Sequence, residues 1–577
     1  MKSRYVLFGA SVAALGMSIP AQAEWIEVRS TNFRYYSEDD PSDVVERVTN
    51  LEKLDKIVRT VTGNDKPPSP LPVTAFELST IDDVQDSSFG VAFAAAYYTT
   101  SKQGAHLVTF HRPVKVRTSG SRTSRTYRIQ DEVTQHEYLH HLMFQYFPTN
   151  YPTFYPEGFA EYYGTIQFKD DNVIVVGHAP LGRLDSMRGD WLHVRDVLTA
   201  KSYADVRNLS ALYAEGWLLT HMAAARPERG KQLQQYLRDV SQGVPYEEAA
   251  TKAFGDLDEF NDELRAYKDE VTALTIKLDG IDPGKVEVRK LSPIEEQLVE
   301  VELAMRSSIK RSELDDLAEK ARSISSQDPS DAYGVGVVAM TEYLAGNLDA
   351  ASTAAARASA LDSDHVRGHM VTGMVATDRL MAAKSTDTAA WDAAREHFEA
   401  ALAADNTATR NLVAYYDSYV KQGVLPPAKA QNALMRAFQL VPRNDDVRYK
   451  LAADFEQRGM IEEALFIISP AAFGTFDGDE RKEKERAEAI REYAEEYTHS
   501  RCVKRLSKCN DVWKPNATGN GTRRASRSSA GKHLPTRTTT PDRAGERFSW
   551  VRGSGGRGGR LAIGSRPAGR SRTSSAS

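Results

Sequence analysis

The stretch that decides the fold of this chain is His-Glu-Tyr-Leu-His at residues 136–140 (HEYLH), within a segment of helical spacing. Positions i and i+4 of a helix share one face, so His136 and His140 can present both imidazoles to one cation. Glu137 then lies beside the cation, where it can take a proton from a metal-bound water. An H-E-x-x-H run also occurs by chance, as a helix with two partly exposed histidines, so the motif needs further support.

A third ligand is required, because catalytic zinc has three protein ligands and one open position. Downstream, Glu157 stands in Pro-Glu-Gly-Phe-Ala-Glu-Tyr-Tyr (PEGFAEYY, residues 156–163), and sixteen residues separate it from His140. Pro156 suits the first position of a second helix, on which Glu161 lies one turn beyond Glu157. The two segments together therefore favour a metal site over a chance motif.

HEYLH followed by PEGFAEYY resembles the gluzincin metallopeptidases, the superfamily of thermolysin and the alanyl aminopeptidases, over roughly residues 25–267. The aminopeptidases carry a similar N-E-G-F-A segment, whose Glu is the third zinc ligand. The resemblance implies that His136, His140 and Glu157 bind one Zn²⁺ per chain. It also implies that Glu137 is the general base.

The same resemblance implies two outer roles. Glu161 occupies the place of an acid that hydrogen-bonds a ligand histidine in thermolysin-like enzymes, although a solvated helix carboxylate is the alternative. Residues 212–222 (LYAEGWLLTHM) are similar to the aminopeptidase Y-x-K-G segment, whose Tyr donates a hydrogen bond to the developing oxyanion. Tyr213 is the matching residue here, and a tyrosine of the core is its alternative.

Two features depart from the family pattern. The spacing to Glu157 is shorter than in thermolysin or the aminopeptidases. Residues 90–98 (GVAFAAAYY) stand where aminopeptidases hold a free α-amine with G-x-M-E-N, and they offer no acid. This argues against an aminopeptidase and favours an endopeptidase. An edge strand around residues 93–98 could then pair with an extended substrate.

The chain divides by composition. Residues 24–277 are predicted to form an α+β gluzincin-type peptidase domain, and residues 278–292, with two glycines and a proline, a linker. Residues 293–500 are Ala-rich and predicted to be an all-α solenoid. Residues 514–577 are rich in Gly, Ser, Thr and Arg without apolar periodicity, which predicts a disordered basic tail.

The Ala-rich part contains repeats that resemble the tetratricopeptide family, with an unrelated helical bundle as the alternative. Small residues recur at similar offsets in successive units, where they let paired helices approach closely. The positions are Gly346, Ala351 and Ala358, then Ala394, Phe398 and Ala401, then Ala430, Leu434, Ala437 and Pro442.

The first 23 residues are predicted to be a secretory signal. Lys2 and Arg4 precede an apolar stretch, and Ala-Gln-Ala at residues 21–23 is a cleavage site, so the mature chain would begin at Glu24. No other run reaches the roughly 18 apolar residues of a membrane span, and no transmembrane segment is expected in the mature chain. We expect an exported protein, periplasmic or secreted.

The charge is unevenly distributed. The tail has a net charge of +12, from 12 Arg, 2 Lys and 2 acidic residues, which leaves −17 on the rest of a chain with net charge −5. Nucleic acid is not an expected partner of an exported, mainly acidic chain. Cys502 and Cys509 are either a local disulfide or incidental.

The sequence thus predicts an exported zinc-dependent metallopeptidase that acts on protein or peptide substrates. The helical repeats are expected to recruit the substrate or a protein partner. The alternative is a catalytically inactive, peptidase-like scaffold that binds partners through its repeats.

Overall fold

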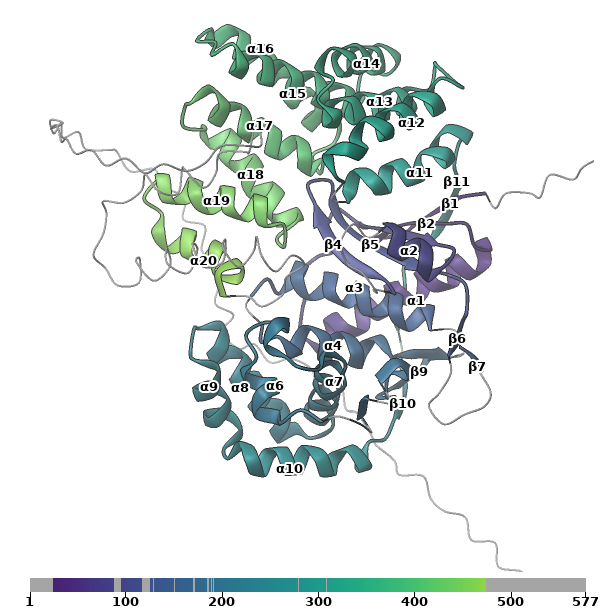
Figure 1. Ribbon diagram of the computed structural model, residues 1–577, viewed down its shortest axis with the longest axis vertical. Coiled ribbons are helices and arrows are strands. Elements are labelled where there is room, and N and C mark those ends of the chain that lie inside the picture. The colour runs from purple at the N-terminus through teal and green to yellow at the C-terminus, as the bar shows by residue number, and fades with distance from the viewer. Residues whose placement is uncertain are drawn as a thin grey trace, which may run out of the picture. The chain divides into compact units, whose positions relative to one another are not determined.

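The structure is a computed structural model of the 577-residue chain. It describes residues 24–473, apart from residues 88–94, 117–124, 128, 150, 170–171, 184–185, 188, 190, 279 and 308. The predicted signal, both cysteines and the basic tail lie outside the described residues. The described helices and strands belong to one compact unit (Figure 1).

A mixed six-stranded sheet organises the N-terminal half, in the order β11-β1-β2-β3-β5-β4. Strands β2, β3 and β5 run parallel, and the other neighbours are antiparallel. The strand bounds are β1 Ile26–Arg29, β2 Phe33–Ser37, β3 Val73–Leu78, β4 Tyr97–Ser101, β5 Gly104–Phe110 and β11 Glu287–Lys290.

Strand β11 corrects the predicted linker. Its four residues lie inside residues 278–292 and pair with the whole of β1, from Ile26↔Lys290 to Arg29↔Glu287. The composition of the segment favours a linker because Gly280, Pro283 and Gly284 precede the strand. The backbone of β11 instead completes the sheet edge, so the chain enters the repeats directly from the sheet.

Helices cover both faces of the sheet. On one face lie α1 (Pro41–Val61) and α3 (Gln130–Tyr146), which share a core with alternate residues of β3 and β5, such as Ala75 and Leu107. The other face carries α2 (Ile81–Ser87) and α11 (Pro293–Arg306), packed on Phe76, Val108 and Phe110. Neighbouring residues of one strand, such as Ala75 and Phe76, reach opposite helix layers because successive side chains point to opposite faces of the sheet.

A helical lobe follows α3 and packs into the same core. Two small sheets accompany it, in the orders β10-β9-β8 and β6-β7. The helix bounds are α4 Phe154–Gly164, α6 Val194–Thr199, α7 Leu209–Ala225, α8 Pro227–Ser241, α9 Tyr246–Phe254 and α10 Leu257–Tyr267. The small strands are β6 Val114–Val116, β7 Arg125–Tyr127, β8 Gln167–Lys169, β9 Val173–Val176 and β10 Leu274–Lys277.

The C-terminal half is an array of paired helices, so the predicted helical solenoid is confirmed as an architecture. The first helices of the pairs are α11, α13 Ala332–Ala345, α15 Val366–Ala382, α17 Thr409–Gln422 and α19 Asp445–Gln457. Their partners are α12 Leu314–Ser325, α14 Leu348–Leu361, α16 Thr388–Ala404, α18 Ala428–Leu440 and α20 Ile461–Phe473.

The small residues that predicted the repeats are buried between these helices. Ala351 and Ala358 in α14, and Ala430 and Ala437 in α18, are fully buried. Gly346 ends α13 at φ +83°, a left-handed conformation that glycine adopts without strain.

The helix α11 joins the two halves. Val299 and Leu303 pack against the sheet, whereas Leu298 and Val301 belong to the core of the repeats. The β4–β5 hairpin also reaches the repeats, because the Gln103 side chain donates a hydrogen bond to the Met305 carbonyl at 3.0 Å.

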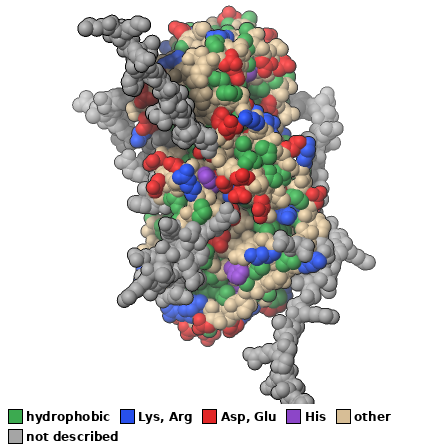
Figure 2. Space-filling view, turned by 90° about the vertical axis from the view of Figure 1, so that its right-hand side faces the viewer, with side chains coloured by type: hydrophobic (Ala, Val, Ile, Leu, Met, Phe, Trp, Pro, Cys, Tyr) green, Lys and Arg blue, Asp and Glu red, His purple; other side chains and the backbone are tan. Residues whose placement is uncertain are grey.

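On the surface that Figure 2 presents, acidic, basic and hydrophobic side chains are intermingled, and no single charge dominates the described part of that face. Among the described residues, no helix combines the length and the apolar composition that crossing a membrane would require.

Candidate metal centre

The helix α3 places His136 and His140 on one face, as the i, i+4 spacing predicts. Their Nε2 atoms lie 3.1 Å apart, and His140 is buried. Leu139 and Leu142, elsewhere on the surface of α3, are fully buried in the core between the sheet and helices α1 and α3. The imidazole pair therefore projects from a helix that its apolar face fixes in place.

Glu157 completes the group from the first turn of α4. Its Oε2 lies 3.2 Å from Nε2 of His136 and 3.5 Å from Nε2 of His140. Zinc–ligand bonds of about 2.0–2.2 Å in a tetrahedron require ligand atoms roughly 3.3 Å apart, so this donor set fits zinc. Among the residues that the structure describes, these three form the one group with metal-binding geometry.

The electrostatics of the group favour a cation. Burial opposes charge on His136, but the hydrogen bond to Glu157 and the charges of Glu161 and Glu137 outweigh it and raise the pKa of His136 to about 9. Burial likewise disfavours the Glu157 carboxylate, yet His140 and His136 hold its pKa well below the usual range. Positive charge is thus stabilised where the three ligand atoms meet.

Glu137 lies next to the ligands without being one of them. Burial raises the pKa of its carboxyl group, which accepts a hydrogen bond from the backbone N–H of Tyr98. Tyr98 belongs to β4, the last strand of the sheet order, so the edge of the sheet lies against the predicted general base.

Glu161 does not make the hydrogen bond that the family resemblance implies. Its Oε1 is 4.0 Å from Nδ1 of His136, which is an electrostatic contact but too long for a hydrogen bond. The same oxygen accepts a hydrogen bond of 2.7 Å from Nε of Arg183. The Arg183 guanidinium also lies 4.5 Å from the ring centroid of Tyr213, and it therefore links Glu161 to α7.

Tyr213 faces the ligand group from α7. Burial raises the pKa of its phenol, and the neighbouring carboxylates of Glu157, Glu137 and Glu161 raise it further. The proton is therefore firmly held, as a hydrogen-bond donor requires.

Tyr203 is a residue of this site that the sequence did not reveal. Its hydroxyl donates a hydrogen bond of 2.8 Å to Oε1 of Glu157, the carboxylate oxygen that faces away from the two imidazoles. It lies in a short 3₁₀ helix, Tyr203–Asp205, inside a polar segment without periodicity. The segment carries no signal that would have set this tyrosine apart.

Two glycines let the helices α4 and α7 cross closely. A Cβ atom added to Gly158 would lie 2.3 Å from the carbonyl oxygen of Gly216, and one added to Gly216 would lie 2.9 Å from the carbonyl oxygen of Phe154. The glycines after Glu157 and before Trp217 in the two motifs therefore have a packing role. They bring α4, which carries Glu157, and α7, which carries Tyr213, into close contact.

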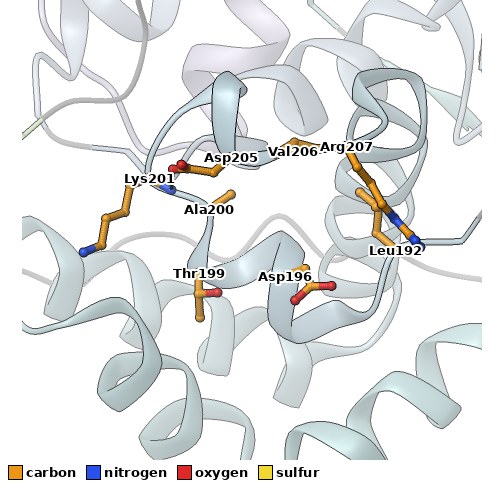
Figure 3. Close-up of a pocket in the computed structure, with 8 residues that line it drawn as sticks. All are labelled: Leu192, Asp196, Thr199, Ala200, Lys201, Asp205, Val206 and Arg207. Atoms are coloured by element: carbon orange, nitrogen blue, oxygen red, sulfur yellow. Dashed lines mark hydrogen bonds between the residues drawn. The ribbon is translucent and has the colours of Figure 1, made fainter. Parts of the chain in front are cut away.

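A pocket of about 530 Å³ lies beside the Tyr203 segment. Figure 3 shows Lys201 and Arg207 on opposite sides of it, with Asp196 and Asp205 between them. None of the residues of the metal centre lines it, so it is distinct from the place where the ligand atoms converge.

Two other histidines of the N-terminal half have structural surroundings. His141 is buried beside Tyr98 and Tyr138, and burial lowers its pKa to about 3. His221 shares a hydrogen bond of 2.8 Å with the Tyr267 hydroxyl.

Comparisons with known proteins bear on the repeats. No family model matches the sequence, and no curated protein does. Among solved structures, a tetratricopeptide-repeat protein of Thermus thermophilus matches 31% of this chain and 90% of its own, at 18% identity and a TM-score of 0.26. A tetratricopeptide-repeat protein of Parabacteroides merdae matches 50% of this chain and 97% of its own, at 10% identity and a TM-score of 0.25.

Both matched proteins are built of tetratricopeptide repeats. TM-scores this low support no conclusion about function. The repeat architecture rests on the paired helices of the chain itself. Neither sequence comparison supports the gluzincin resemblance, which stays a prediction.

Proposed function

We propose that this chain is a helical-repeat protein that carries a zinc-dependent metallopeptidase centre. The observation that carries the proposal is the convergence of His136 Nε2, His140 Nε2 and Glu157 Oε2, 3.1–3.5 Å apart, beside Glu137. Zinc at this place would supply Lewis-acid polarisation of a water molecule and of a scissile carbonyl.

The residues around the ligands have matching roles in peptide hydrolysis. Glu137 accepts a proton from the water and delivers it to the leaving amine. The backbone N–H of Tyr98 holds the Glu137 carboxylate toward the site. Tyr213 donates a hydrogen bond to the oxyanion, and the outer edge of β4 pairs with an extended substrate.

The test combines metal analysis with one substitution in the full chain. The purified protein should hold about one zinc per chain. Glu137→Gln should retain that zinc and lose hydrolysis of unfolded casein, because the base is removed and the ligands stay. Glu46→Gln, the same change at an exposed position of α1, is the control and should keep both properties.

Activity of a metal-free preparation equal to that of the zinc-loaded protein would overturn the proposal. So would a Glu137→Gln variant that cleaves casein at the original rate.

A second candidate function is a non-catalytic interaction scaffold. The array of paired helices from α11 to α20 favours it directly, whereas neither sequence comparison favours hydrolysis. In that case His136, His140 and Glu157 would bind a structural metal, and Glu137→Gln would change neither zinc content nor partner binding. A zinc-loaded protein that cleaves no peptide in a broad library would favour the scaffold.

A further inference from the structure

A turn of the repeat array lies close to the metal centre. Residues 441–444 join α18 to α19, and this turn carries Arg443. The Arg443 guanidinium lies 4.8 Å from the ring centroid of Phe144, which is on α3 one turn after His140. The rings of Phe144 and His140 are stacked, with centroids 6.2 Å apart and an angle of 12° between their planes. A positive charge that belongs to the repeats is therefore near a proposed zinc ligand.

Two contacts, one on each side of Arg443 in the sequence, hold the turn in this place. The Gln145 side chain on α3 donates a hydrogen bond of 2.9 Å to the carbonyl of Gln439 on α18. Lys102, at the tip of the β4–β5 hairpin, forms an ion pair of 2.8 Å with Asp446 on α19. Figure 1 shows the last repeats beside α3 and this hairpin.

The turn itself has little freedom. Pro442 has a fixed φ angle, and its carbonyl accepts a hydrogen bond from the buried Arg448 side chain. Asn444 caps α19, because its side chain accepts a hydrogen bond of 3.1 Å from the Val447 N–H. Arg443 lies between these two residues and is therefore carried on a well-defined backbone.

The charge of Arg443 acts on residues that surround the proposed ligands. Burial raises the pKa of the phenols of Tyr98 and Tyr203, and the positive charge of Arg443 opposes that shift in both. The backbone N–H of Tyr98 donates to Glu137, and the Tyr203 hydroxyl donates to Glu157. The guanidinium is therefore near both the edge strand β4 and the ligand group.

A guanidinium that lies over an aromatic ring can still bind a carboxylate. Its N–H groups lie in its own plane, so their hydrogen bonds extend past the edge of the ring below. Arginine binds carboxylates through paired, charge-assisted hydrogen bonds, which strengthen where water is partly excluded. A carboxylate on a bound substrate is thus the group that matches Arg443.

We propose that Arg443 binds an acidic side chain of the substrate, an Asp or a Glu close to the peptide bond that is cleaved. This inference rests on the proposed peptidase function and adds a substrate class to it. The distances from Arg443 to the Phe144 ring and from that ring to His140 are 4.8 Å and 6.2 Å. An extended substrate on the edge of β4 advances roughly 3.3 Å per residue, so the acidic residue is expected within about three residues of the cleaved bond.

The first experiment measures binding and does not depend on hydrolysis. The full chain carries Glu137→Gln and is loaded with zinc. The probes are acetyl-Ala-Ala-Ala-Glu-Ala-Ala-Ala-amide and the same peptide with Gln in place of Glu, so neither has a carboxylate at its end. The Glu peptide should bind at least about tenfold more tightly than the Gln peptide.

Substitutions of Arg443 in this chain identify the residue that makes the distinction. Arg443→Gln should bind the two peptides equally. Arg443→Glu should instead prefer a third peptide with Lys in place of Glu, a reversal that a merely structural role would not produce. Arg357→Gln, an exposed arginine on α14, is the matched control and should keep the original preference.

The second experiment sequences the products of unfolded casein. The original chain should cut near Asp or Glu more often than the composition of casein predicts, and Arg443→Gln should lose this preference while keeping its zinc.

Equal binding of the Glu and Gln peptides by the Glu137→Gln chain would overturn the role of Arg443, whether or not casein is cleaved. Equal weakening of all three peptides in Arg443→Gln and Arg443→Glu would also overturn it, as would cleavage of casein without an acidic preference. A preference for the Glu peptide that depends on Arg443, in a chain that cleaves no casein, would overturn the peptidase function instead and leave Arg443 as a binding residue for acidic segments.

Discussion

At the scale of single residues, the orientation of the proposed metal ligands depends on contacts that the motifs do not contain. Tyr203 fixes the outer oxygen of Glu157, and the inner oxygen then faces the two imidazoles. Tyr203→Phe should therefore lower zinc affinity by about 10–100-fold, the usual effect of removing a hydrogen bond to a ligand. Competition with a chelator of known zinc affinity would measure the change.

Tyr213→Phe is the matched control for that substitution. Tyr213 lies near the same carboxylates but makes no hydrogen bond to Glu157 that the structure describes. The Tyr213→Phe variant should therefore keep its zinc affinity. Its kcat should fall by a factor of about 10²–10³, as after loss of an oxyanion donor. Equal effects of both variants on zinc affinity would contradict the separate roles.

Glu215, on α7, predicts a pH dependence of stability. It is 2% exposed, its Oε1 accepts a hydrogen bond of 2.6 Å from the Leu192 N–H, and burial raises its pKa to about 8. The folded state keeps this proton while the unfolded chain loses it near pH 4.3. The contribution of Glu215 to stability is therefore fully present below about pH 4.3, and it is lost by at most about 1.4 kcal/mol per unit as the pH rises to about 8.

Glu215→Gln keeps a hydrogen-bond acceptor for Leu192 and has no proton to lose. The variant should melt at a higher temperature than the original protein at pH 8, and the difference should shrink toward pH 5. Thermal unfolding at both pH values tests this, and parallel pH profiles of the two proteins would contradict a raised pKa at Glu215.

The sequence predicted that His136, His140 and Glu157 come together, as they do in the structure, but it did not predict the residues that hold them in place. His136 and His140 could be paired because helical periodicity acts within a short stretch of chain, and Glu157 could be added because its segment resembles a gluzincin motif. Tyr203 and Arg183 could not, because each comes from an irregular segment whose position depends on the packing of the whole lobe.

At the scale of helices and strands, the crossing of α4 and α7 decides the geometry of the site. Gly158→Ala would place a methyl group on the Gly216 carbonyl, and the helices would have to move apart. We expect a loss of about 1–3 kcal/mol in the free energy of unfolding, and more if the backbone cannot adjust. Zinc affinity should fall too, because Glu157 is the adjacent residue.

Gly182→Ala is the control for this change, because a Cβ atom there meets nothing within 4 Å. Its melting temperature and zinc affinity should equal those of the original protein. A Gly158→Ala variant with unchanged stability would show that the two helices are not locked at these glycines.

The sheet illustrates what local patterns can predict. The strands β2, β3 and β5 follow from their aromatic or β-branched residues. By contrast, β11 (EVRK) is polar and exposed and becomes a strand by pairing with β1. Glu77, inside β3, is fully buried because it accepts hydrogen bonds from Tyr35 and Ser37 and pairs with Arg47 at 2.6 Å. Such long-range partners have no local sequence signal.

At the scale of the whole described chain, the two halves share a helix rather than a flexible linker. The two apolar sides of α11 belong to different cores, one formed with the sheet and one with the repeats. The backbone N–H of Trp25, at the start of the described chain, also donates a hydrogen bond of 3.0 Å to Glu296 on α11. A substitution that destabilises the core at the sheet is therefore expected to destabilise the repeats as well, through α11.

Leu303→Ala tests this coupling. Leu303 is 6% exposed between α11 and the sheet, and its truncation should cost about 2–5 kcal/mol. If the halves unfold together, calorimetry of the original protein shows one transition, and the variant shows one transition at a lower temperature. Leu361→Ala, which removes an exposed leucine from α14, should leave the profile unchanged. Two transitions in the original protein, only one of them shifted by Leu303→Ala, would show that α11 belongs to one half alone.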